Sequence, residues 1–189
     1  MSGGYYNPAV SLAVWLRGKL RAEECVAYIV VEVLAGVAAA AVVAALGYTP
    51  ATAVKVGGTG SMLVAEFLFT FALAYVVLNV GTARSTEGNS FYGLAIGFTV
   101  AAGALAVGPI SGGAFNPAVA VGASVMGLFA WSHIWIYLVA NVVGGAAGAW
   151  AFLATEQEPD RVAEPQGVET TAPQQDRLRP RRPDIPATG

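Results

Sequence analysis

Long apolar runs, separated by short polar segments, occupy residues 1–154 of the chain. An α-helix needs about 20 predominantly apolar residues to cross the hydrocarbon core of a bilayer. Four runs approach or exceed that length with few charges, so the pattern predicts four membrane-spanning helices. We expect these spans over residues 25–46, 63–80, 91–107 and 134–153.

Two further apolar runs, over residues 7–17 and 116–127, are too short to span a bilayer. Each begins with Asn-Pro-Ala, and proline suits the first turn of a helix because an N–H at that position would have no intrahelical partner. The asparagine before it can cap the helix with its side-chain oxygen. The two runs therefore predict half-helices that enter the membrane and turn back.

The segments around the two half-helices are copies of each other. Residues 2–10 and 111–119 share Ser-Gly-Gly and Asn-Pro-Ala-Val in the same register. The same offset aligns residues 28–36 with residues 137–145 without a gap. Two separated matches in one register indicate an internal duplication rather than a chance repeat. Paired half-helices of this kind are typical of membrane proteins built from inverted repeats.

The number of predicted spans between Asn7 and Asn116 is three, which is odd. The half-helices must therefore enter from opposite faces of the membrane, and their N-termini meet near the midplane. Each helix N-terminus presents unpaired N–H groups and about half a positive charge. Two of them oppose the passage of a cation, and the asparagine amides can donate to a neutral solute with an exposed oxygen.

Composition supports a membrane protein and argues against several other classes. Hydrophobic residues make up 56% of the chain and charged residues 12%, against about 25% charged residues in a soluble domain. The single cysteine rules out an intrachain disulfide. Because no nucleophile and base arrangement and no cluster of metal ligands stands out, we expect no enzyme, no metal and no cofactor. Membrane lipid is an expected partner, and nucleic acid is not.

The basic residues predict the orientation in the membrane. Lys and Arg gather before the first predicted span, between the second and third, and after the fourth, whereas only Lys55 lies on the other side. Cytoplasmic loops carry the excess of Lys and Arg. Residues 155–189 are rich in Glu, Gln, Asp, Arg and Pro with little to bury, so we expect a disordered cytoplasmic tail. The chain would be a multi-pass protein of a plasma or inner membrane.

The paired motifs resemble those of the aquaporin, or major intrinsic protein, family over residues 2 to about 154. This resemblance implies an all-α membrane protein with an aquaporin-like fold of inverted repeats, one pore per subunit and a homotetramer. It further implies a passive channel for water and small neutral solutes, such as urea, glycerol, ammonia or peroxide. Protons and ions would be excluded at the two Asn-Pro-Ala motifs, which are Asn7, Pro8, Ala9, Asn116, Pro117 and Ala118.

Further residues take expected roles from the resemblance. Glu66 stands where the family keeps a membrane-embedded glutamate that braces a half-helix loop, and Glu32 stands where glutamine is usual. We expect both to hold half-helix loops. The selectivity filter maps to Ala104, Gly113 and Val119, where water-selective members often have His for the first and Arg for the last. Small and apolar residues at these positions predict a wide, weakly polar constriction.

The two copies of the repeat differ in extent. The second copy holds three spans and a half-helix, as the family's unit does, whereas the first holds one half-helix and one span. The resemblance therefore predicts that two helices upstream of Met1 are missing, as in an N-terminally truncated or mis-started channel. Two alternatives stay open: a proton-coupled secondary transporter using Glu32 and Glu66, and a non-conducting fragment that needs the missing helices.

Overall fold

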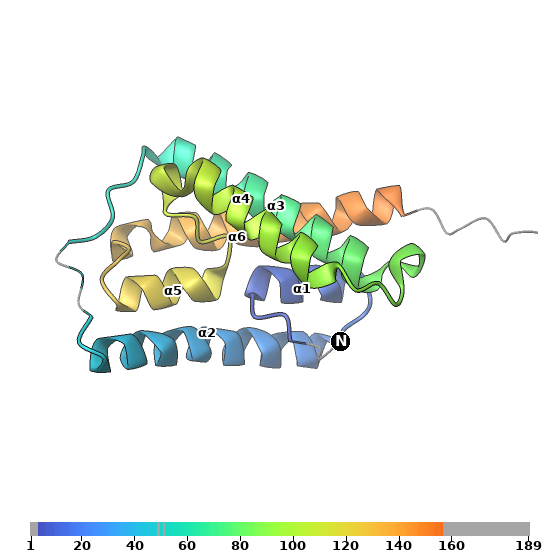
Figure 1. Ribbon diagram of the computed structural model, residues 1–189, viewed down its shortest axis with the longest axis horizontal. Coiled ribbons are helices and arrows are strands. Elements are labelled where there is room, and N and C mark those ends of the chain that lie inside the picture. The colour runs from blue at the N-terminus through green and yellow to red at the C-terminus, as the bar shows by residue number, and fades with distance from the viewer. Residues whose placement is uncertain (1–3, 49, 51, 157–189) are drawn as a thin grey trace, which may run out of the picture. The chain divides into compact units, whose positions relative to one another are not determined.

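Six α-helices and two short 3-10 turns make up the described part of this computed structural model, residues 4–48, 50 and 52–156 (Figure 1). Four helices are long and apolar enough to cross a membrane, and no strand occurs among these residues. The predicted all-α membrane fold is confirmed. The predicted tail lies, from residue 157 on, outside the described residues. The long helices are α2 (Ala22–Ala45), α3 (Thr59–Thr82), α4 (Tyr92–Ser111) and α6 (Ile134–Thr155).

The two half-helices are α1 (Pro8–Leu16) and α5 (Pro117–Val125). In each, the asparagine immediately before the helix is the N-cap, and proline occupies the first turn. Each helix ends just before a glycine with positive φ, Gly18 at 75° and Gly127 at 79°. A left-handed glycine is a common helix stop because it has no Cβ to clash. These glycines also stand at matching positions of the repeat, so both copies stop their half-helix in the same way.

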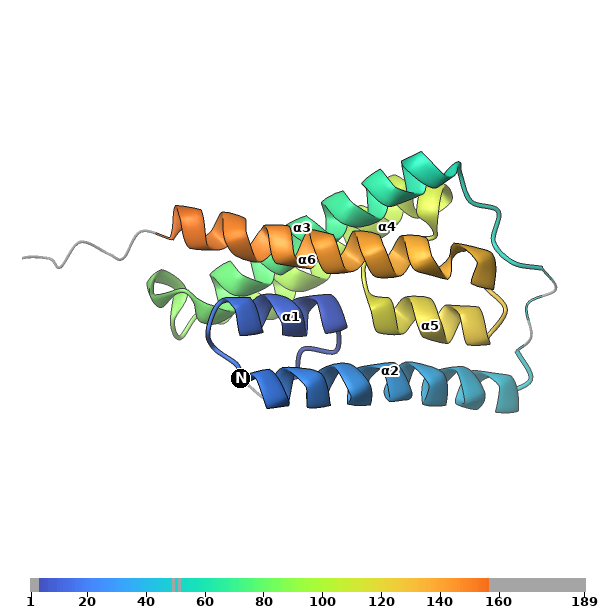
Figure 2. The same ribbon diagram turned by 180° about the vertical axis from the view of Figure 1, so that it is seen from behind.

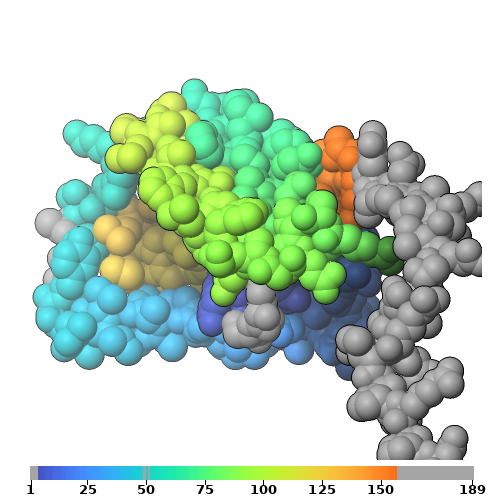
Figure 3. All heavy atoms as spheres, turned by 45° about the vertical axis from the view of Figure 1, so that its right-hand side comes forward, coloured from blue at the N-terminus to red at the C-terminus, as the bar shows by residue number. Residues whose placement is uncertain are grey.

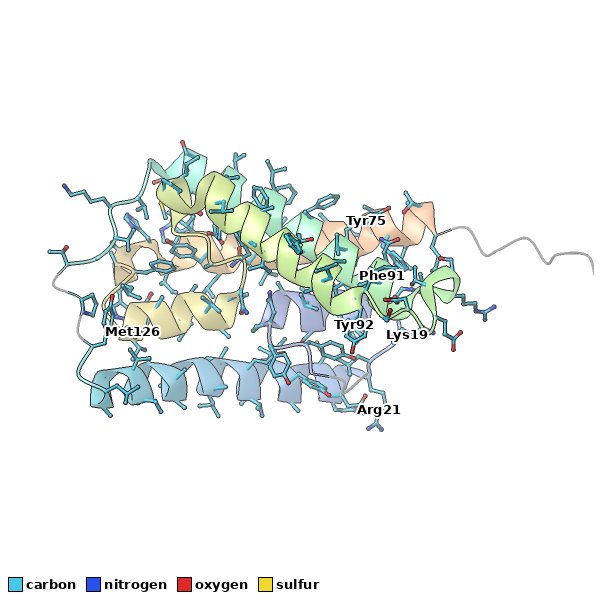
Figure 4. All side chains as sticks on the ribbon, viewed as in Figure 1. Lys19, Arg21, Tyr75, Phe91, Tyr92 and Met126 are labelled. Atoms are coloured by element: carbon cyan, nitrogen blue, oxygen red, sulfur yellow. The ribbon has the colours of Figure 1, made fainter. Side chains whose placement is uncertain are left out.

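The half-helices run in opposite directions from a common meeting point. Figures 1 and 2 show α1 and α5 end to end between α2 and α6. Lys19, which follows α1, lies at one end of the bundle, and Met126, the C-cap of α5, lies at the other (Figure 4). The predicted arrangement of two inverted half-helices with facing N-termini is therefore present.

One long helix of each copy packs on the half-helix of the other copy. A Cβ added to Gly36 of α2 would stand 2.5 Å from the Ala118 carbonyl oxygen of α5. At the matching position of α6, a Cβ on Gly145 would stand 2.6 Å from the Ala9 carbonyl oxygen of α1. Close approach of this kind needs small residues at the helix crossing. The two copies are thus interlocked rather than placed side by side.

The face between α2 and α4 is open. Figure 3 shows it hollowed between the blue α2 and the green α4, with yellow atoms of the second copy at its floor. A groove of about 570 Å³ runs along α2 and α5 and past residues 4–6. Glu32 and Val119 are among its lining residues. The site described next lies at this groove and beneath it.

The extents of two long helices differ from the hydropathy pattern. The helix α3 begins at Thr59 rather than near residue 63, because Gly58 forms its N-cap. The helix α4 continues through Pro109 to Ser111, where the apolar run predicted an end at residue 107. It stops at Gly112, whose φ of 88° ends the helix and whose N–H bonds to the Gly108 carbonyl. The last turn of α4 therefore leads directly into the second half-helix loop.

Candidate functional site

Two asparagines join the half-helix N-termini by crossed hydrogen bonds. The Asn7 Nδ2 group donates to the Phe115 carbonyl at 2.9 Å. The Asn116 Nδ2 group donates to the Tyr6 carbonyl at 2.8 Å. Each asparagine therefore holds the loop of the other copy. Because an amide nitrogen carries two hydrogens, each Asn keeps a second N–H beyond this bond.

The oxygen atoms of the same side chains cap their own helices. Asn7 Oδ1 accepts from the Ala9 N–H at 2.9 Å. Asn116 Oδ1 accepts from Ala118 N–H at 2.9 Å and from Val119 N–H at 3.3 Å. Each asparagine side chain thus caps its own helix through Oδ1 and donates to the loop of the other copy through Nδ2. Pro8 and Pro117 are buried in the first turns beside them.

The residues before the asparagines adopt an unusual backbone conformation. Tyr6 has φ 55° and Phe115 has φ 46°, which is the left-handed region that bulky residues rarely enter. This conformation turns the preceding loop back so that the two carbonyls meet the asparagine amides. Backbone strain of this kind persists where surrounding bonds enforce it, and it concentrates at functional sites.

Glu66 of α3 binds the second half-helix loop. Its Oε1 atom accepts from Ser111 Oγ at 2.7 Å and from the Ala114 N–H at 3.0 Å, and its Oε2 atom accepts from the Phe115 N–H at 2.7 Å. The residue is 0% exposed. The carboxylate therefore satisfies three buried donors that would otherwise lack a partner.

Glu32 of α2 binds the first half-helix. Its Oε1 atom accepts from the Asn7 N–H at 3.0 Å and from Ser11 Oγ at 2.9 Å. The repeat offset places Glu32 opposite Asn141 of α6, which instead accepts from Thr70 Oγ1 with its side-chain oxygen at 2.9 Å. Glu32 and Glu66 therefore bind one half-helix each, although the two residues do not occupy equivalent positions in the two copies.

The aromatic residues of the two loops have different surroundings. Phe115 is 1% exposed, and its ring lies 5.3 Å from that of Phe69 and against Gly103 of α4. Tyr6, its counterpart in the first copy, is 77% exposed at the groove. Tyr5 beside it packs its ring 5.1 Å from that of Tyr28.

The three residues that the sequence suggests for a selectivity filter do not all meet. Gly113 lies against α4, where an added Cβ would stand 3.5 Å from the Ala104 Cα atom. Val119 is 49% exposed and lines the groove beside α2. The structure therefore brings Ala104 and Gly113 together and leaves Val119 on the open side of α5.

Two residues that hold the second loop were not identified as such from the sequence. The Tyr137 hydroxyl donates to the Ser111 carbonyl at 2.5 Å, and Phe129 stacks on the Tyr137 ring at 4.8 Å between centroids. A signal for Tyr137 does exist, because the repeat pairs it with Tyr28. Phe129 carries no such signal. Within the described residues no group of three metal-ligating side chains occurs.

The fold and the crossed half-helices define a polytopic membrane protein made of two inverted, interlocked repeats. Comparison with known proteins identifies the family. The family model described as "Major intrinsic protein" matches residues 1–152. The chain belongs to the major intrinsic protein family.

Individual relatives are identical to this chain at about a third of the aligned positions. It is 38% identical over 156 residues to "Aquaporin NIP1-3" of Oryza sativa subsp. japonica, covering 80% of the chain and 54% of that protein. It is 35% identical over 157 residues to "Nodulin-26" of Glycine max, covering 80% and 57%. It is 32% identical over 159 residues to "Glycerol uptake facilitator protein-like 6" of Lactiplantibacillus plantarum, covering 79% and 73%. The chain thus spans little more than half the length of these two plant relatives.

Proposed function

We propose that the chain forms a passive pore for water and small neutral solutes, with the crossed asparagines as the barrier to protons and cations. The observation that carries this proposal is the pair of hydrogen bonds from Asn7 to the Phe115 carbonyl and from Asn116 to the Tyr6 carbonyl. These bonds bring two helix N-termini together, and the positive ends of their dipoles face each other. The combined field repels a cation from the meeting point.

The second N–H of each asparagine, which is not used in the crossed bonds, donates a hydrogen bond to the solute. A water molecule that accepts from these donors points its own hydrogens away from the meeting point. Its oxygen then has no remaining capacity to accept a proton from a neighbouring water. Proton transfer along a chain of waters is thereby interrupted while neutral molecules still pass.

The residues at the three predicted filter positions would admit solutes larger than water. Ala104, Gly113 and Val119 add no charge and little bulk, and none can provide the fixed cation that narrows a water-selective pore. The printed names of the relatives include aquaporins and a glycerol uptake facilitator. We therefore assign to this chain the passage of urea- or glycerol-sized neutral solutes together with water.

Glu66 and Glu32 serve as braces for the loops in this proposal. Glu66 accepts three hydrogen bonds, and Glu32 accepts from two donors on the first half-helix. Carboxylates held in this way are occupied with the protein's own donors, which argues against their use as proton-coupling groups of a transporter. The pore belongs in a multi-pass membrane protein with a cytoplasmic C-terminus, assembled as a homotetramer.

The test is flux through vesicles that contain the full chain. Purified protein is reconstituted into liposomes, and the rates of osmotic shrinkage and of urea and glycerol entry are measured by stopped-flow light scattering. We expect both to exceed the rates of empty vesicles and to be unaffected by a proton gradient. Rates equal to those of empty vesicles would support the non-conducting alternative. Dependence on a proton gradient would support the transporter instead.

A further inference from the structure

The second half-helix loop is held from two sides, and only one of them involves Glu66. The other side is the aromatic pair Phe129 and Tyr137. Tyr137 is 1% exposed, and its hydroxyl donates to the Ser111 carbonyl at 2.5 Å. The Ser111 hydroxyl donates to Glu66 of α3, and the Ser111 carbonyl accepts from Tyr137 of α6. Ser111 is thereby fixed by two partners from different helices.

Phe129 restricts the residue that follows. A Cβ added to Gly112 would stand 2.6 Å from the Phe129 ring, so the ring rests directly on this glycine. The Phe129 ring lies parallel to that of Tyr137, at an interplanar angle of 5°. The Phe129 main chain is itself anchored, because its N–H donates to the Ala123 carbonyl at 3.2 Å. Aromatic stacking and close contact therefore prevent Gly112 from moving toward α6.

The turn that these residues restrain contains a proposed filter residue. Gly112 and Gly113 have φ values of 88° and 69°, and the Gly113 N–H donates to Ser111 Oγ at 3.1 Å. Gly113 in turn lies against Ala104 of α4. A displacement of Ser111 or Gly112 would be passed to Gly113 through this short turn and would change the spacing between Gly113 and α4.

We infer that Phe129 and Tyr137 are positioning residues that set the width of the pore at Gly113 and hence its discrimination between water and larger neutral solutes. This inference rests on the proposed pore function. Neither residue contacts the solute. They act by limiting how far the Gly112 and Gly113 turn can fluctuate. A larger solute passes only in the widest states of a constriction, so a looser turn raises its flux more than that of water.

The test combines Tyr137→Phe and Phe129→Leu with a matched control. Tyr137→Phe removes only the hydroxyl that bonds Ser111, and Phe129→Leu removes the ring that rests on Gly112. Tyr75→Phe is the control, because the Tyr75 hydroxyl bonds the Thr155 hydroxyl at the exposed end of α6, far from the loop (Figure 4). In vesicles containing the full chain, we expect both test variants to raise the ratio of urea to water permeability. For Tyr137→Phe the rise should be about two- to tenfold, the factor that one net hydrogen bond corresponds to. The control should leave the ratio unchanged.

Hydrogen exchange gives a second measurement that does not depend on conduction. The amides of Gly112 and Gly113 should exchange faster in Tyr137→Phe and Phe129→Leu than in Tyr75→Phe. An unchanged permeability ratio in vesicles that do conduct would overturn the selectivity role while the pore itself stands. Unchanged exchange at both glycines would overturn the positioning role. If wild-type vesicles conduct nothing, the pore and its selectivity both fail, and the exchange comparison decides whether the aromatic pair holds the turn.

Discussion

Replacing Glu66 by glutamine should weaken the second half-helix loop, because glutamine offers one acceptor oxygen where the carboxylate offers two. The Oε1 atom of Glu66 serves Ser111 Oγ and the Ala114 N–H, and Oε2 serves the Phe115 N–H. With glutamine, the amide NH2 group must face at least one of these donors. That donor then has no acceptor at a residue that is 0% exposed.

The size of this effect follows from the number of donors left unsatisfied. A hydrogen bond to a charged group contributes roughly 1.5–3 kcal/mol, and a buried donor without a partner costs roughly 1–3 kcal/mol. Glu66→Gln, which loses one such bond, should lower the free energy of unfolding by about 1.5–3 kcal/mol. Glu66→Ala strands all three donors, and the loss should reach roughly 3–9 kcal/mol by the same values.

The assay is denaturation in detergent combined with vesicle flux. Glu87→Gln is the matched control, because Glu87 lies exposed between α3 and α4. We expect the order of stability to be control, Glu66→Gln, Glu66→Ala, with osmotic water permeability falling in the same order. If Glu66→Gln equals the control in both stability and water permeability, the carboxylate does not hold the loop.

Three further changes test other parts of the site. Asn116→Asp keeps a cap oxygen but replaces the amide donor by a negative charge, so a proton leak should appear in vesicles loaded with a pH-sensitive dye. A variant without a proton leak would contradict the proposed barrier. Val119→Arg should reduce urea and glycerol flux more than water flux, and equal losses of both would count against Val119 as a filter residue. Gly36→Ala places a methyl group 2.5 Å from the Ala118 carbonyl oxygen and should cost about 1–3 kcal/mol by overpacking. Gly97→Ala on α4, where nothing lies within 4 Å, is its control, and equal melting temperatures would exclude the tight α2 and α5 contact.

Local features of the sequence were sufficient to predict the elements of the fold. Apolar length separated the four long helices from the two short ones, and Asn-Pro-Ala marked where each short helix begins. The parity of the spans predicted that Asn7 and Asn116 would meet. These inferences succeed because helix length, capping and the direction of crossing depend on residues that are close together in the chain.

Contacts between the two copies could not be predicted in the same way. Nothing local shows that the Asn7 amide bonds the carbonyl of Phe115 rather than one of its own loop. Phe129 escaped notice because an isolated Phe in a linker resembles any other apolar residue. The apolar run suggested an end of α4 at residue 107, two residues before Pro109. The helix nevertheless continues to Ser111 because Gly112, and not Pro109, provides the conformation that ends it.

The crossed hydrogen bonds also impose an order on biosynthesis. The Asn7 amide and the Phe115 carbonyl are separated by 108 positions along the chain. When α1 leaves the ribosome, the acceptor for its cap amide has not been synthesised, and the Tyr6 carbonyl equally lacks its donor. In hydrocarbon such unpaired groups cost several kcal/mol each. We therefore expect the first half-helix to reach its full depth only after α5 has been made, so that the N-terminal end of the described protein is among the last parts to complete its fold.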